Sequence, residues 1–87
     1  MKKAARETAA ATYQIRRREI EAMIGLLQSQ LDDHAREAAR DPRNWGFPGD
    51  LDQISQNLRE TLVFLTGDSD EEAAGRKIEK AVAARMA

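Results

Sequence analysis

Few residues in this sequence are of a type that could carry out chemistry. The chain has no cysteine and only one histidine, His34, so it lacks a thiol nucleophile and the three or four ligands that usually hold zinc. Its serines, Ser29, Ser55 and Ser69, have no neighbour in sequence that could serve as their general base. A glycine-rich phosphate-binding loop is also missing. We therefore expect a non-enzymatic protein without metal or cofactor.

The run Arg16, Arg17 and Arg18 is the clearest candidate for a binding function. Consecutive guanidinium groups could neutralise phosphates, which makes nucleic-acid contact one hypothesis. Consecutive residues on a helix nevertheless point about 100° apart, and an antiparallel second arm would bring the acidic residues of 68–72 close to them. We favour the interpretation that the run is solvated or paired internally, and keep nucleic-acid contact as the alternative.

The charge along the chain is uneven. The net charge of the whole chain is −1, but residues 1–20 contain six basic and two acidic side chains and carry +4, which leaves −5 for the remainder. A basic end therefore precedes an acidic remainder, and the chain as a whole is not a general polyanion binder.

Two aromatic residues, Trp45 and Phe47, lie in a short segment rich in glycine and proline. Tryptophan is frequent among the residues that dominate binding at interfaces, so this segment is a candidate partner-binding loop. The alternative, which we favour, is that both rings fold back and close the open end of a helical hairpin. Substitution of a buried Trp45 by alanine would then cost about 3–5 kcal/mol of stability.

A long helix is expected over residues 4–40, which contain no proline and are rich in Ala, Glu, Arg, Gln and Leu. Its large apolar side chains recur at spacings of three, four and seven residues, which is the pattern of a heptad seam on one helix face. Smaller or polar positions at His34 and Ala38 continue this seam, and Leu26 borders it. The residues predicted to form a dimer interface are Tyr13, Ile20, Met23, Ile24, Leu27 and Leu31.

Two shorter helices are expected after a loop over residues 41–50. Asp50 followed by Gln53 predicts a capped helix over 51–66, and Gly67 is a suitable left-handed terminator. Ser69 followed by Glu72 has the form of a capping box and predicts a weaker third helix over 70–86.

These lengths predict an all-α protein with a single domain over residues 1–87. Two short helices placed end to end would span the long one, so we expect a helical hairpin with a broken return arm. A three-helix bundle, with the third helix beside the second, is the alternative. One arm covers only part of the seam, and we therefore expect dimerisation into a helical bundle.

The expected function is that of a homodimeric scaffold or regulator that binds another protein. The alternative is a small dimeric nucleic-acid-binding regulator that uses the basic half of the long helix. Small plasmid-encoded RNA-binding regulators also dimerise from helical hairpins, but a shared architecture does not carry a function. The longest strongly apolar run, residues 62–65, is far too short to span a membrane, and we expect a cytoplasmic protein.

Overall fold

The computed structural model describes residues 2–87, with side chains from residue 8 onward, and shows three helices. They are α1 (Lys2–Arg40), α2 (Gly46–Thr66) and α3 (Glu71–Met86), and residues 2–87 contain no strand. The all-α prediction is therefore confirmed. The chain divides into two units, of which the first ends at Arg43 and the second begins at Asn44.

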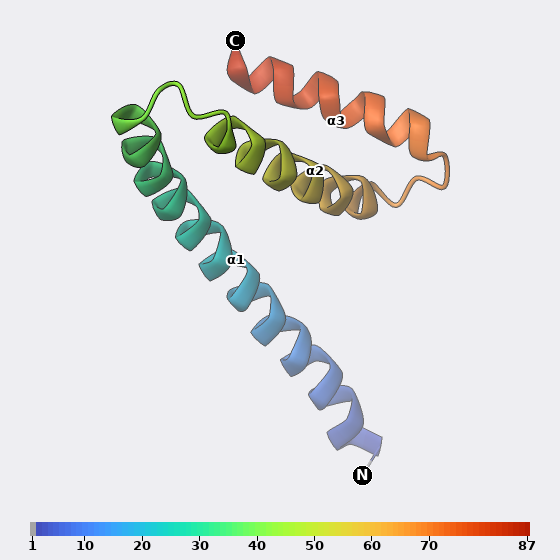
Figure 1. The fold of residues 1–87 in the computed structure, drawn as a ribbon. Helices are drawn as coiled ribbons and strands as arrows, with labels where there is room; N and C mark the ends of the chain where they lie inside the picture. Colours follow the sequence, from blue (N-terminus) through green and yellow to red (C-terminus); the bar gives the residue numbers. More distant parts are fainter. Residues whose placement is uncertain (1) are drawn as a thin grey trace. The chain divides into compact units, whose positions relative to one another are not determined.

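The first unit consists of the single helix α1 and the residues that follow it (Figure 1). With 39 residues at about 1.5 Å each, α1 is roughly 58 Å long. It ends where predicted, because Asp41 precedes Pro42 and proline disfavours helical geometry in the residue before it. Arg40 in the last turn places a positive charge at the negative end of the helix dipole.

The second helix begins earlier than the sequence indicated. We expected Asp50 to cap a helix over 51–66, but α2 starts at Gly46, and the connection shrinks to residues 41–45. Asn44 explains the difference, because its side-chain oxygen accepts a hydrogen bond of 2.8 Å from the amide of Gly46. Pro48 fits inside this first turn, where backbone amides have no carbonyl partner within the helix.

The turn between α2 and α3 is built by glycine and two aspartates. Gly67 adopts a left-handed conformation with φ of 70° and ends α2, as predicted. The cap of α3 is Asp70 and not Ser69, because Oδ1 of Asp70 accepts hydrogen bonds from the amides of Glu72 and Ala73. Asp68 supports the turn by accepting a hydrogen bond of 2.9 Å from the amide of Asp70.

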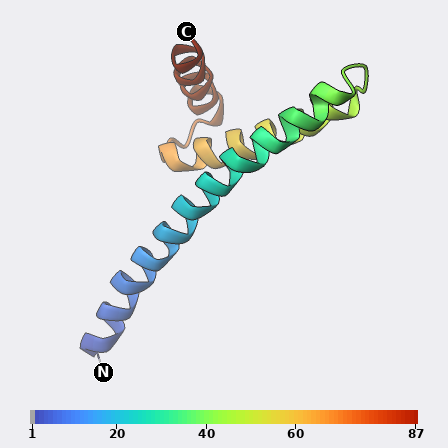
Figure 2. The ribbon, with the colours of Figure 1, turned by 90° about the vertical axis from the view of Figure 1, so that its left-hand side faces the viewer.

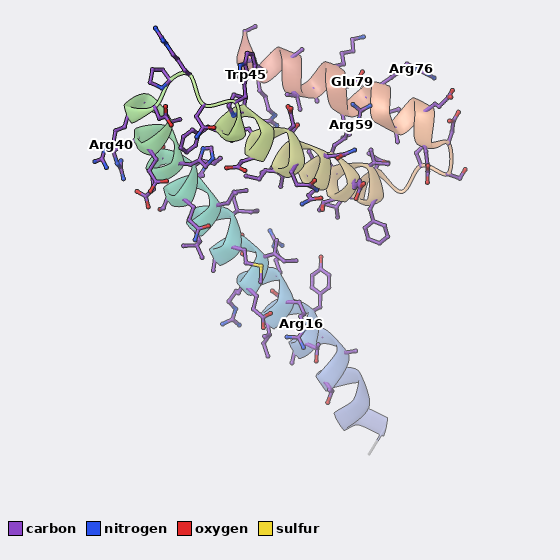
Figure 3. The ribbon with its side chains drawn as sticks, in the orientation of Figure 1. Arg16, Arg40, Trp45, Arg59, Arg76 and Glu79 are labelled. Atoms are coloured by element: carbon purple, nitrogen blue, oxygen red, sulfur yellow. The ribbon has the colours of Figure 1, made fainter. Side chains whose placement is uncertain are left out.

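Helix α3 folds back and packs against α2 within the second unit (Figure 1). The contact is centred on Ala74 and Gly75, which are the buried residues of α3, and the helix axes diverge away from it (Figure 2). Arg59 of α2 and Glu79 of α3 face each other and form an ion pair across the gap (Figure 3). The predicted return arm, with α2 and α3 end to end, is therefore wrong: the reversal at residues 67–70 places α3 beside α2.

Candidate functional site

The most unusual property of this chain is how little apolar surface it buries. Among residues 8–87, Ala74 is the one apolar side chain that is fully buried. Most large apolar side chains of both units retain substantial contact with solvent. A short chain normally depends on its core for stability, so the surfaces that remain apolar are the first candidates for a functional site.

The longest of these surfaces is the seam of α1. The side chains of Tyr13, Ile20, Met23 and Ile24 are between 53% and 65% exposed. Leu27 and Leu31, farther along the same face, are half-buried. The six residues predicted as an interface thus lie on one helix, at the spacing that places them on one face.

The basic run lies on the same helix. Nη1 of Arg16 is 2.9 Å from Oε1 of Glu19, one turn along α1, and Arg17 and Arg18 are exposed. Two of the acidic residues in 68–72 have roles in the second unit. Asp68 pairs with Lys77, and Asp70 caps α3.

Trp45 does not close the end of a hairpin. Trp45 directly precedes α2, and its side chain is 85% exposed (Figure 3). The prediction that this ring is buried is therefore wrong. The loop predicted over residues 41–50 is shorter in the structure, because Phe47 belongs to the first turn of α2, where it is half-buried. Trp45 therefore remains a candidate anchor for another protein.

The exposure of one aromatic side chain, Phe64, was not predicted from the sequence. Phe64, near the end of α2, is 83% exposed, and its neighbour Leu65 is 72% exposed. The apolar residues of α2 recur at helical spacing and include Leu65, whereas Phe64 falls outside this pattern. Periodicity therefore did not mark Phe64 as part of an apolar surface.

An open groove of about 700 Å³ lies between α2, the turn and α3. Its polar lining includes Arg59, Asp68 and Glu71. The amide of Asp70 and then the ammonium of Lys77 hold the pKa of Asp68 below its ordinary value, since both stabilise the carboxylate. Arg59 pairs with Glu79 and Asp68 pairs with Lys77, and neither contact joins a nucleophile to a base.

Comparisons with known proteins add no functional assignment. No protein-family model, curated protein or solved structure matches the chain.

Within residues 2–87, no helix combines the length and apolar character needed to cross a membrane. The longest exposed apolar surface of the described residues is the seam of α1.

Proposed function

We propose that this protein is a non-enzymatic helical interaction protein that works as a homodimer and scaffolds or regulates another protein. The observation that supports the proposal is the exposed apolar seam of α1 in a chain whose described side chains include one fully buried apolar residue. Monomeric proteins in water rarely leave an extended apolar strip uncovered. A second copy offers the same strip and is the commonest way to cover it.

The seam offers each chain four large aliphatic side chains, at Ile20, Ile24, Leu27 and Leu31. Ile20 and Ile24 are 56% and 53% exposed, and Leu27 and Leu31 are half-buried, so each can bury further apolar area against a second copy. Burial of apolar area is the main favourable contribution to protein association.

A single charge in the seam tests the homodimer. Ile24→Asp buries an unpaired carboxylate if the seam is an interface, so the variant should dissociate or unfold. Glu19→Ala is the matched control, because Glu19 is exposed and its ion pair with Arg16 contributes little. Light scattering should give twice the chain mass of 9.7 kDa for the wild type and the control. A folded wild-type monomer at high micromolar concentration would contradict the proposal.

The binding of another protein is assigned to Trp45. Tryptophan is enriched among residues that dominate interface energies, and this side chain is free of the intramolecular packing that we had expected for it. If the assignment is correct, Trp45→Ala should leave helicity and melting temperature almost unchanged while reducing recovery of a partner from the native host.

A nucleic-acid-binding regulator is the second candidate function. The observation that favours it is the exposure of Arg17 and Arg18, together with the roles that Asp68 and Asp70 have in the second unit. Titration with duplex DNA and RNA at low and moderate salt separates the two candidates. Binding that weakens steeply with salt, and is lost when all three arginines are neutralised, would favour the regulator.

A further inference from the structure

We propose that the α1 helices of two copies pair in antiparallel orientation, centred between Gly25 and Leu26. The basic half of each α1 then lies along the acidic half of the other. This inference rests on the proposed homodimer and specifies its geometry. It concerns α1 alone, which forms a unit with no second helix of its own to pack against.

The distribution of charge along α1 supports the antiparallel orientation. In the proposed register, residues 11–20 of one α1 lie along residues 31–40 of the other. The first stretch carries a net charge of +2 and the second a net charge of −1. A parallel pair would place the two basic halves side by side. An antiparallel pair places each basic half beside an acidic one, which favours association and determines orientation.

The heptad pattern then selects the register. With the centre between Gly25 and Leu26, Ile24 lies opposite Leu27 of the second copy. In the next layer outward, Ile20 lies opposite Leu31, so the four largest aliphatic residues of each seam meet one another. A shift by one heptad in one direction would bring Leu27 opposite Arg17 and Leu31 opposite Tyr13. A shift in the other direction would bring Ile24 opposite His34 and Ile20 opposite the small side chain of Ala38.

Arg17 distinguishes the two orientations most clearly. It occupies the same heptad position as Ile24 and Leu31, so its side chain points toward the partner helix. In a parallel dimer, two copies of Arg17 would face each other across the seam, and like charges in that position repel. In the antiparallel register, Arg17 faces His34 of the second copy.

The flanking positions provide a specific ion pair. In the antiparallel register, Arg16 lies beside Glu37 of the second copy, and the two-fold symmetry produces this pair twice. Both side chains are exposed on α1, and the bond of Arg16 to Glu19 uses only one of its five donors. Glu21 lies opposite Gln28, so Glu21 has no charged counterpart in this arrangement.

Cysteine cross-linking tests the orientation, because the native chain has no cysteine. Tyr13 and Ala38 lie opposite each other in the antiparallel register, whereas two copies of Tyr13 are separated by about 37 Å along the pair, at 1.5 Å per residue. The Tyr13→Cys and Ala38→Cys chains are mixed under reducing conditions and then gently oxidised, and the covalent products are identified by mass.

We expect the mixed dimer, Tyr13→Cys linked to Ala38→Cys, as the predominant product. A Tyr13→Cys chain linked to itself would require a parallel pair and would overturn the inference. So would a dimer by light scattering that forms no cross-link in any combination. A monomer by light scattering would instead contradict the proposed homodimer itself, so the two failures can be distinguished.

Charge reversal tests the register independently. Glu37→Arg should weaken dimerisation about five- to tenfold, because each of the two ion pairs with Arg16 becomes a repulsion. The double variant Arg16→Glu with Glu37→Arg should restore the affinity. Glu21→Arg changes the charge equally and should have a much smaller effect. A larger loss for Glu21→Arg than for Glu37→Arg would overturn the register.

Discussion

At the level of single residues, the cap of α3 depends on Asp70. Asp70→Ala removes the acceptor of two amide hydrogen bonds at the start of the helix and should lower the free energy of unfolding by about 1 kcal/mol. Ser69→Ala is the matched control, because the sequence suggested Ser69 as the cap but the structure assigns this role to its neighbour. Urea denaturation measures both. Equal losses for the two variants would contradict the assignment.

The same neighbours show how far a residue's role can be predicted from sequence. Both Ser69 and Asp70 are good caps, and the pattern of a capping box favoured Ser69 because Glu72 follows at the required spacing. The outcome depended on Asp68, whose carboxylate binds the amide of Asp70 and shapes the turn. The predicted burial of Trp45 was wrong for a related reason. A side chain is buried only where another surface packs against it, and composition does not reveal whether such a surface is nearby.

At the level of helices, the connection between α2 and α3 should be sensitive to acid. The pKa of Asp68 is lowered by the amide of Asp70 and by Lys77, so its carboxylate stabilises the folded state above the ordinary value of 3.8. That stability is lost as the pH falls through the lowered pKa.

Asp68→Asn should therefore reduce stability near neutral pH and should show a smaller further loss on acidification than the wild type. Denaturation followed by circular dichroism at about pH 6 and about pH 2.5 measures this difference. The variant keeps one side-chain oxygen that can accept the hydrogen bond of the Asp70 amide, whereas its NH2 group replaces the oxygen that accepts from Lys77. The comparison therefore measures the charge together with the hydrogen bond from Lys77. Identical pH profiles would show that the carboxylate contributes nothing to folding.

The helices themselves were more predictable than their packing. The ends of α1 and α2 were located by Pro42 and Gly67, each of which acts on the local backbone. The start of α2 was missed because Asp50 is a good cap residue and because Pro48 was interpreted as loop, although proline suits a first helical turn. The contact between α2 and α3 was predicted only as the alternative arrangement, because a short turn determines it and helix length does not.

At the level of the whole molecule, the seam was visible in the sequence because periodicity reports which side chains share a helix face. How far the seam is exposed could be learned only from the structure. Four of its residues are more than half exposed there: Tyr13, Ile20, Met23 and Ile24. Periodicity cannot identify the surface that covers a face. The partner and the orientation of pairing therefore had to be argued from charge and register.

If folding of this chain is coupled to dimerisation, its melting temperature should depend on concentration. Association links folding to mass action, so a tenfold increase in chain concentration stabilises the folded dimer by about 1.4 kcal/mol. For two chains of this length, that corresponds to a rise of about 4 °C in melting temperature. Circular dichroism across a hundredfold range of concentration would measure it.

The cross-linked pair of Tyr13→Cys and Ala38→Cys chains provides the internal control. A covalent link makes the association of the two chains independent of their concentration. The cross-linked dimer should therefore have the same melting temperature throughout the range, and one higher than that of the wild type at the lowest concentration. Ile24→Asp, if it remains helical, should also melt independently of concentration because it no longer associates. A wild-type melting temperature that stays constant over the whole range would show that the exposed seam of α1 is not covered by a second copy.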